Sequence, residues 1–441
     1  MDEFDIVVIG GGPAGLSAAI EAQEKGASAV VLEAAGEAGG LTRSFEQDGY
    51  TFDCSGHLLH LSDPEAVALV ERATSAEDWN RIDRDSVIYL ENAFIPYPFQ
   101  LHLAYAPERV RRECVELLPE EAPGYEDPEL LNDFGSWITA NLGDGIGRWF
   151  MVPYNEKLST VPVGDLTCEW LGRFVPRPGI EEIRQGAAQK RTRQTGYNRS
   201  FLYPRQGGIA TMSRGLARLV PNLVTGAPVT AVDTEARIVR SGDGREFSYR
   251  RAVVATQPLP ELAAIVTPAD ERLERRRELR ANSVTCVNVG VRDANPAFAS
   301  HQWVYLPEER FASYRFGFYA RFAESMAPPG REGMYVEVAH GPEAAEAEVV
   351  DAAIGDLLGA GVIDDRTAVE TVLPVRIETA YVIHDRATSG ARAALREALE
   401  ERGIFAAGRY GNWEYSAMED AIVGGMHATR EALASGSAAR R

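Results

Sequence analysis

The feature that most constrains this chain is a glycine-rich segment at residues 5–43. An apolar run at 6–9 is short enough to be a strand buried on both faces. It leads directly into the pattern G-x-G-x-x-G, formed by Gly10, Gly12 and Gly15. Because this pattern alone is weak evidence for a binding site, its flanking residues decide its meaning.

The flanks of the glycine pattern predict a strand–helix–strand unit. Pro13 suits the first turn of a helix, apolar residues at helical spacing run from 14 to 22, and Gly26 stands where that helix should end. A second apolar run at 29–32 ends in Glu33. Glycines let the backbone approach a pyrophosphate, the helix N-terminus attracts its charge, and Glu33 can accept a hydrogen bond from a ribose hydroxyl. The segment therefore predicts a Rossmann-like α/β domain that binds a dinucleotide.

The residues after Glu33 distinguish between dinucleotides. A glycine pair at 39–40 is followed by Leu41, Thr42 and Arg43, and then by the segment 49–53. This arrangement resembles the FAD-binding half of the glutathione-reductase-like flavoproteins. The resemblance implies FAD rather than NAD.

Composition is typical of a water-soluble enzyme. A chain of 441 residues is too long for one simple core, so two or three subdomains are expected. No apolar run approaches the ~20 residues that span a membrane, and the acidic start at 1–5 does not fit a signal peptide. The formal charge of -20 argues against nucleic acid or an anionic membrane as a partner. Four cysteines without metal-type spacing suit the reducing cytoplasm, which is the expected location: Cys54, Cys114, Cys168 and Cys286.

The order of the patterns along the chain predicts three parts. We expect a discontinuous FAD-binding domain at 1–80, 205–265 and 400–441, with a helix over 210–219 and strands within 228–256. We expect a helical insertion with a mobile substrate loop at 101–204. We expect an antiparallel substrate-binding sheet at 81–100 and 266–399, with a hairpin at 87–95 and a helix at 343–358.

Positive charge gathers at 173–206, where the apolar periodicity is poor. The basic residues there are Arg173, Arg177, Arg184, Lys190, Arg191, Arg193, Arg199 and Arg205. A charge run is usually a solvated face. In a strongly acidic protein, a basic loop beside a dinucleotide domain is better explained by an anionic substrate.

A second anion-binding helix N-terminus is predicted near the end of the chain. A short apolar strand at 404–407, a glycine turn at 408–411 and a helix with acids in its first turn follow one another. Gly424 and Gly425 lie inside that helix, where each costs about 1 kcal/mol relative to alanine. Such glycines indicate close backbone approach to the cofactor domain.

Motifs along the whole chain resemble those of the UDP-galactopyranose mutase family. They are the segment 52–57, Tyr97-Pro98-Phe99-Gln100, 153–157, Trp170-Leu171-Gly172-Arg173, Asn198 with Phe201 and Tyr203, Trp303 with Tyr305, Tyr314-Arg315, Tyr381, and Gly408-Arg409 with Trp413 and Tyr415. Within that family, 153–157 and 170–173 correspond to a strand and a mobile loop that close over the nucleotide. Each match is weak, but together and in order they are specific.

The resemblance implies a reaction and a set of site residues. Reduced FAD would attack the sugar C1 through N5, forming a covalent adduct that opens and recloses between pyranose and furanose forms. Arg173 and Arg315 would clamp the diphosphate, and His57 would lie against the flavin ring, so these three are the expected catalytic residues. The expected cofactor-binding residues are Gly10, Gly12, Pro13, Ala14, Gly15, Glu33, Gly40, Leu41, Thr42, Arg43, Gly56, His57, Val229, Gly408, Arg409, Tyr415, Ser416, Ala417 and Met418. The expected substrate-binding residues are Tyr97, Gln100, Tyr154, Asn155, Ser159, Arg173, Asn198, Tyr305, Arg315, Tyr381 and Tyr415. The histidines show no metal spacing, so no metal is expected.

The nucleotide base is left open by a departure from the family pattern. Ser159 stands where the family has a tryptophan that packs against uracil. Loss of an aromatic platform removes stacking worth about 1–3 kcal/mol and leaves room for a larger base such as guanine. Alternatively, Phe99 or Tyr97 has taken over the stacking and uracil is retained.

Two other functions remain open. The first is an FAD-dependent oxidoreductase of the amine oxidase, phytoene desaturase or protoporphyrinogen oxidase type, and the second is a non-catalytic flavoprotein. An arginine- and tyrosine-rich anion clamp favours the mutase over both. The expected partners are a nucleotide-diphosphate sugar and an external reductant, either NAD(P)H or a flavin reductase, with homodimerisation left open. No second G-x-G-x-x-G indicates a separate NAD(P)H domain.

Overall fold

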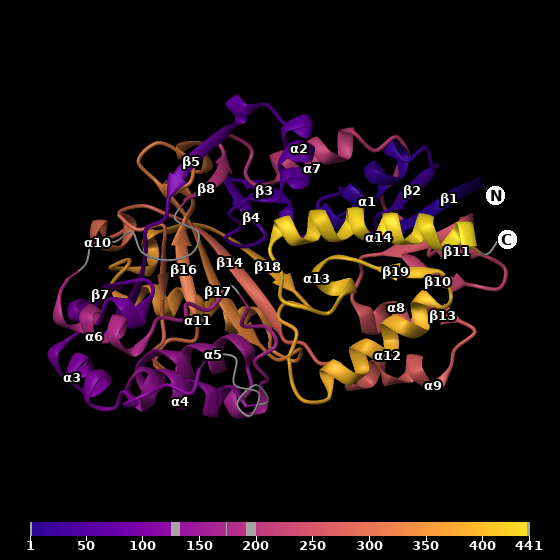
Figure 1. Ribbon diagram of the computed structural model, residues 1–441. Helices are drawn as coiled ribbons and strands as arrows, with labels where there is room; N and C mark the ends of the chain where they lie inside the picture. The colour runs from indigo at the N-terminus through magenta and orange to yellow at the C-terminus, as the bar shows by residue number, and fades with distance from the viewer. Residues whose placement is uncertain (1, 125–132, 173, 191–199, 439–441) are drawn as a thin grey trace.

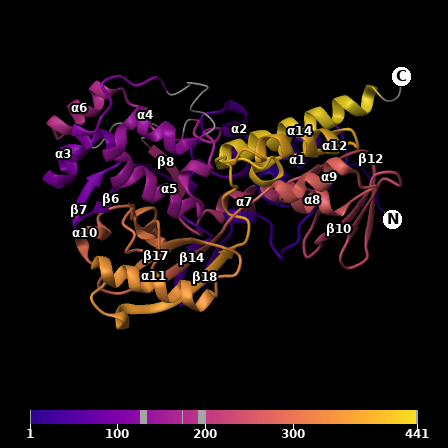
Figure 2. The same ribbon diagram turned by 90° about the horizontal axis from the view of Figure 1, so that it is seen from below.

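Two large sheets lie in separate halves of the molecule, and both chain ends lie in the half that carries the first sheet (Figures 1 and 2). The structure is a computed structural model that describes residues 2–124, 133–172, 174–190 and 200–438. Helical segments connect and cover the two sheets. The mixed α/β architecture expected from the sequence is confirmed.

The first sheet contains the predicted strand–helix–strand unit. Its strands, in spatial order, are β13 (Val266–Thr267), β10 (Val229–Asp233), β11 (Ile238–Ser241), β12 (Glu246–Ala255), β1 (Asp2–Ile9), β2 (Ala29–Leu32) and β9 (Leu223–Val224), with β19 (Ile404–Ala406) paired to β12. β1 is parallel to both β2 and β12, and β12 is parallel to β19. The carboxyl ends of these strands therefore meet at one edge, where doubly wound sheets bind ligands.

Both faces of the first sheet are covered, which explains why its central strands are apolar throughout. Ile6 and Val8 of β1 pack in one cluster with residues of α1 (Pro13–Glu24) and α14 (Met418–Ala438), while Val7 and Ile9 pack in another with α8 (Leu259–Ile265) and α12 (Thr388–Glu400). α1 and α14 lie side by side in both views (Figures 1 and 2). A Cβ on Gly425 would lie 2.0 Å from the carbonyl oxygen of Ala14, so the predicted close approach is confirmed.

The second sheet is almost entirely antiparallel, as expected. Its order is β18 (Val369–Ile377), β14 (Ser283–Val291), β17 (Glu332–His340), β16 (Arg315–Phe318), β15 (Trp303–Tyr305), β6 (Ser86–Leu90) and β7 (Ala93–Pro96). Only the pair β15–β6 is parallel. α11 (Glu346–Ala360) covers one face, burying Val349 and Leu357 against valines of β14. On the opposite face, Cys286 and Tyr335 belong to the core cluster that also contains residues of the first sheet.

The predicted insertion between the sheets is helical. Its helices are α3 (Glu108–Glu116), α4 (Phe134–Ile146), α5 (Val152–Ser159) and α6 (Ile180–Ala188), with a π-helical turn Gly147–Met151 joining α4 to α5. The expectation of a strand at 153–157 is wrong. These residues form α5, because Pro153 suits a first helical turn and Tyr154 and Leu158 lie four residues apart on one side. α6 was also missed within the basic segment, although Ile183 and Ala187 have helical spacing.

Shorter elements join the three parts. The strand pairs are β3 (Ser44–Gln47) with β4 (Tyr50–Asp53) and β5 (Trp79–Asp83) with β8 (Ser200–Pro204), and the helices are α2 (Pro64–Ala73), α7 (Ala210–Arg218), α9 (Glu271–Glu274), α10 (Pro296–Ala299) and α13 (Gly408–Gly411). The three-part division remains a proposal, but two of its segments lie elsewhere. β13 pairs with β10, and α12 packs on the first sheet, so both belong with the FAD-binding part and not with the substrate-binding part expected at 266–399.

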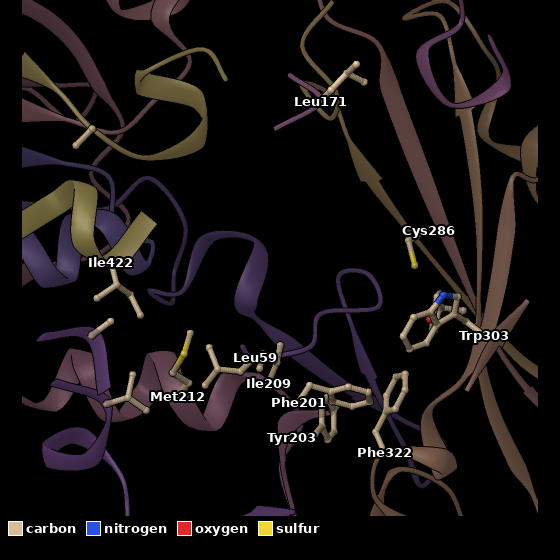
Figure 3. Close-up of a cluster of buried hydrophobic side chains, with 14 of the residues drawn as sticks. Leu59, Leu171, Phe201, Tyr203, Ile209, Met212, Cys286, Trp303, Phe322 and Ile422 are labelled. Atoms are coloured by element: carbon tan, nitrogen blue, oxygen red, sulfur yellow. The ribbon is translucent and has the colours of Figure 1, made fainter. Parts of the chain in front are cut away.

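One hydrophobic core extends across all three parts. Figure 3 shows Met212 and Ile422 from the first half, Leu171 from the insertion, and Cys286 and Trp303 from the second sheet. Burying these side chains together fixes the halves relative to each other. All four cysteines are free and buried. Among the described helices, none combines the length and apolarity that crossing a bilayer requires.

Candidate active site

A single cavity of about 1080 Å³ lies where the three parts meet. Its lining includes the glycine turn after β1, the segment 55–58, the end of α5, and cavity-facing residues of β15 and β16. The chain therefore brings all the predicted cofactor residues except Gly15, and most of the predicted substrate residues, into one space.

The glycine turn presents bare backbone to the cavity. Gly10 has a φ of +99°, and a Cβ there would lie 2.2 Å from Oγ1 of Thr256. A Cβ on Gly15 would lie 1.8 Å from the carbonyl oxygen of Gly10, so the third glycine allows α1 to pack closely on β1. Gly15 does not itself line the cavity, whereas Gly10, Gly12 and Pro13 do. The first turn of α1 is thus open to a phosphate.

Glu33 ends β2 at the same edge of the sheet. Its Oε2 accepts a hydrogen bond from the amide of Gly11 at 2.6 Å, and its Oε1 accepts one from the amide of Ala35 at 2.8 Å. These bonds hold the carboxylate, 8% exposed, at the cavity wall. Each oxygen retains a second lone pair, so Glu33 is free to accept from ribose hydroxyls, and that role stays a prediction.

The turn at 408–417, which leads into α14, forms a second place in the cavity where an anion could bind. Arg409 donates from Nη1 to the carbonyl oxygen of Ser416 at 3.2 Å and from Nη2 to that of Ala380 at 3.1 Å. Its Nε and the Ser416 hydroxyl are buried without hydrogen-bond partners in the described part of the chain. Glu419 accepts from the amides of Ser62 and Asp63, which fixes the start of α14. Unpaired buried donors beside a helix N-terminus fit the phosphates of a dinucleotide.

His57 also lines the cavity and is neutral at pH 7. Burial, with the nearby guanidinium groups of Arg315 and Arg409, lowers the pKa of His57 to about 4, although the carboxylate of Glu337 opposes this shift. Its Nδ1 is buried and has no hydrogen-bond partner in the described ranges. A neutral imidazole with a free ring nitrogen can contact a flavin without adding positive charge.

An ion pair with Glu337 orients Arg315, the cation on the side of the cavity formed by the second sheet. Arg315 of β16 lies directly opposite Glu337 of β17, and its Nε is 2.5 Å and its Nη2 3.0 Å from the carboxylate oxygens. Glu337 is fully buried and also accepts from the Ser55 hydroxyl and from the amide of Gly56 at 3.4 Å. Burial acts to raise the pKa of Glu337, but the guanidinium of Arg315 outweighs it and holds that pKa below its usual value. Glu337 therefore orients Arg315 and the loop before His57 together.

Aromatic hydroxyls surround Arg315. The rings of Tyr381 and Tyr415 are stacked at 6.0 Å, and the hydroxyls of Tyr381 and Tyr314 are 3.5 Å apart. The ring centroid of Tyr305 lies 5.3 Å from that of Tyr97 and 5.4 Å from that of Tyr154. Burial raises the pKa values of Tyr97, Tyr154, Tyr314 and Tyr381, so these phenols keep their protons and can donate hydrogen bonds.

Most predicted substrate residues line this cavity, but some lie elsewhere. Those lining it are Tyr97, Gln100, Tyr154, Asn155, Tyr305, Arg315, Tyr381 and Tyr415. Ser159 is not among the lining residues, because its hydroxyl bonds the carbonyl oxygen of Val161 at 3.0 Å in the turn that ends α5. Arg173 and Asn198 lie outside the described residues. Of the basic segment, the described Arg177, Arg184, Lys190 and Arg205 do not line the cavity.

Sequence reasoning missed two charged groups of the site. Arg84 stacks over the ring of Tyr97 at 4.3 Å and over that of Trp303 at 5.0 Å, and its Nη2 donates to the Tyr305 hydroxyl at 3.3 Å. No pattern around residue 84 marks it. Glu337 left a usable signal, since an acid inside an otherwise apolar strand must be paired when buried. Within the described residues, no group of three or more histidines, cysteines and acids could hold a metal ion.

Comparison with known proteins defines the family. A solved structure of reduced UDP-galactopyranose mutase is similar over 98% of this chain and 96% of its own, with a TM-score of 0.91 at 24% identity, which confirms the expected fold. Putrescine oxidase bound to putrescine superposes less closely, with a TM-score of 0.66 over 98% of this chain and 99% of its own at 15% identity. Prolycopene isomerase 2 of an Oncidium hybrid cultivar is 38% identical over 337 residues. That alignment covers 66% of this chain and 55% of the isomerase, so the chain spans about half the length of this relative. The model of the flavin containing amine oxidoreductases matches residues 13–433, and the chain therefore belongs to this family, with FAD as its cofactor.

Proposed function

We propose that the protein is an isomerase that interconverts the pyranose and furanose forms of a nucleotide-diphosphate sugar and requires reduced FAD. The observation that carries this proposal is the convergence of Arg315 and the surrounding phenols on the cavity that also contains the dinucleotide turn. A positive, hydroxyl-rich wall beside the cofactor suits a diphosphate. An amine or a carotenoid has no group that needs such a wall.

The site residues have roles that follow from their geometry. When bound and reduced, FAD supplies a nucleophile for the anomeric carbon of the sugar. Arg315, held by Glu337, stabilises the negative charge that grows on the leaving diphosphate. Tyr305, Tyr381 and Tyr415 donate hydrogen bonds to its oxygens. Neutral His57, which lines the cavity, would lie against the bound flavin and would add no positive charge there.

The proposal also assigns roles to Arg173 and Asn198, and these two roles rest only on the family resemblance. Arg173 would close over the diphosphate from the loop after Trp170, and Asn198 would contact the sugar nucleotide. Leu171 and Phe174, on either side of Arg173 in the chain, offer partial support. Leu171 is buried, and the Phe174 ring packs on Tyr415 at 4.6 Å.

The requirement for reduced flavin separates this function from the alternatives. The purified protein is incubated with UDP- and GDP-hexoses with and without dithionite, and the sugars are separated chromatographically. We expect conversion only after reduction, with the flavin still reduced at the end. Equal conversion by oxidised and reduced enzyme would contradict the proposed requirement for reduced FAD. Consumption of oxygen or another electron acceptor during turnover, with putrescine as one substrate tested, would identify an oxidoreductase. No turnover of either class, with FAD bound, would identify a non-catalytic flavoprotein.

The base of the nucleotide is decided by titration. The prediction of a purine depends on space beside Ser159, but Ser159 is the last residue of α5, bonds the carbonyl oxygen of Val161, and does not line the cavity. The stacked rings of Phe99, Phe150 and Tyr154 supply an aromatic platform instead, of which Phe150 and Tyr154 line the cavity. Flavin-fluorescence titration of the reduced enzyme with UDP, GDP and dTDP identifies the base.

A further inference from the structure

Two residues of the proposed anion clamp are joined by one short connection. β15 ends at Tyr305, β16 begins at Arg315, and these two residues lie directly opposite each other in the strand pairing. Both line the cavity. The conformation of residues 306–314 therefore sets how far the Tyr305 hydroxyl and the Arg315 guanidinium lie from a bound anion.

The ammonium group of Lys157 in α5 forms hydrogen bonds to both ends of this connection. Its Nζ donates to the carbonyl oxygens of Leu306 at 2.7 Å, Glu308 at 2.8 Å and Ser313 at 3.3 Å. Three acceptors match the three hydrogens of an ammonium, whereas the planar fork of an arginine does not fit such a tripod. The chain has only three lysines, at 25, 157 and 190, so a lysine here is unusual.

The helix that carries Lys157 also contacts the rest of the clamp. Tyr154, one turn earlier, packs edge-on against Tyr305 at 5.4 Å and against Tyr314 at 6.3 Å. At the same end of α5, Asn282 donates to the carbonyl oxygen of Leu158, the residue after Lys157, at 2.7 Å and accepts from the amide of Tyr381 at 3.0 Å. α5 therefore connects the Tyr305–Arg315 pair to Tyr381 across the cavity.

We propose that Lys157 is a positioning residue that keeps Tyr305 and Arg315 in place beside Tyr154 for a nucleotide diphosphate. This inference rests on the proposed function. Lys157 does not line the cavity itself, so it acts through the connection that it holds. Asp356 of α11 holds the same connection from the far side, accepting from the amides of Ala312 at 3.2 Å and Ser313 at 2.6 Å.

The charge of Lys157 makes this role dependent on pH. Burial lowers the pKa of Lys157 to about 8, although the carboxylates of Asp356, Glu308 and Glu309 oppose the shift. Above that pH the amine loses one of its three hydrogens and its positive charge, and the tripod loosens. Burial raises the pKa values of Tyr97 and Tyr381, so these two phenols keep their protons in the same range. Nucleotide affinity should therefore fall as pH rises through about 8.

The test compares Lys157→Met and Lys157→Arg with the wild type. FAD content is measured by absorbance, and the dissociation constants for UDP and GDP are measured by flavin fluorescence between about pH 7 and pH 9.5. Lys25→Met is the matched control, because Lys25 is exposed, pairs with Glu21 of α1, and lies outside the cavity lining. Asp356→Asn loosens the connection without removing the ammonium.

We expect both Lys157 variants to keep FAD and to bind the preferred nucleotide at least about tenfold more weakly at pH 7, since small misplacements of positioned groups cost up to about a hundredfold. The decline in affinity above pH 8 should persist in Lys25→Met and disappear in Lys157→Met. In Asp356→Asn it should move to lower pH, because the Asp356 carboxylate raises the pKa of Lys157. Unchanged affinity in Lys157→Met, or a flat pH profile in the wild type, would overturn the inference alone. Failure of the wild type to bind any nucleotide diphosphate would overturn the proposed function with it.

Discussion

The cofactor half and the substrate half of the cavity are suited to bind anions in different ways. In the cofactor half, bare backbone at Gly10 and Gly12 and the first turns of α1 and α14 face the space, so the absence of side chains creates the site. In the substrate half, the charge and hydroxyls of Arg315, Tyr305 and Tyr381 project from separate segments. We therefore expect the cofactor half to lose FAD when a side chain is added to one of its glycines. We expect the substrate half to lose nucleotide binding and turnover when one of its side chains is shortened.

The largest effect should come from adding a side chain to the cofactor half. Gly15→Val places a Cβ 1.8 Å from the carbonyl oxygen of Gly10, and overpacking costs about 1–3 kcal/mol even where neighbours can move. We expect the purified variant to lack FAD, as measured by its flavin absorbance. Gly355→Ala on α11, where a Cβ meets open space, is the control and should bind FAD like the wild type. Full FAD content in Gly15→Val would contradict the role of this close approach.

Removing a cation from the substrate half should abolish turnover and leave the cofactor in place. Arg315→Ala should lower kcat/KM about 10²–10³-fold, the range found when one stabilising donor of a transition state is lost. Arg315→Lys should recover only part, because a point charge replaces a planar fork. Steady-state kinetics with the reduced enzyme and FAD content by absorbance check both statements. Loss of FAD together with activity would show that the two halves are not separable.

Glu337→Gln tests whether the negative charge of Glu337, and not only its shape, is needed to hold Arg315 in place. The amide keeps the shape of the carboxylate but leaves Arg315 without its buried counter-ion, and breaking a buried pair costs about 3–5 kcal/mol. We expect a lower free energy of unfolding in urea and weaker nucleotide binding, with FAD retained. A variant as stable as the wild type would mean that Arg315 finds another partner.

A smaller effect should appear in the dependence of stability on pH. Burial, aided by Arg392 and Arg409, lowers the pKa of His384 to about 4. In the unfolded chain this histidine takes up a proton as pH falls below about 6.5, but in the folded chain only near 4, so stability is lost as pH falls between these values. The loss from pH 6.5 to 5 is about 2 kcal/mol.

His384→Phe should therefore narrow the difference in urea stability between pH 7 and pH 5. His57 is a second histidine with a lowered pKa, so part of the slope should remain. An unchanged slope in His384→Phe would show that His384 takes up its proton equally in both states.

The smallest effect is expected at Ser159. Its hydroxyl serves the turn after α5, so Ser159→Ala should change the dissociation constants for UDP and GDP by no more than about twofold, the scale of substitutions away from special features. Fluorescence titration measures this directly. A tenfold change would return Ser159 to the nucleotide site and support the predicted change of base.

The cofactor half was largely predictable because its determinants are local. Strand, glycine turn, helix and terminal acid lie within 5–43, and each reflects backbone conformation or helix termini over a few residues. The approach of Gly425 to Ala14 could likewise be anticipated, since glycines inside a helix have a cost that close packing explains. The resemblance to a family added Arg315 and the tyrosines, but it also led to a strand where α5 lies.

By itself, then, the sequence determined the α/β dinucleotide-binding unit and the kinds of side chain available for an anion. Only the tertiary structure decided which of them meet. Glu337 and Arg315 are 22 residues apart and become partners through the pairing of β16 with β17, and Lys157 reaches the β15–β16 connection from a helix about 150 residues earlier. Strand register and helix packing depend on the burial of the whole core, so no local pattern carries them.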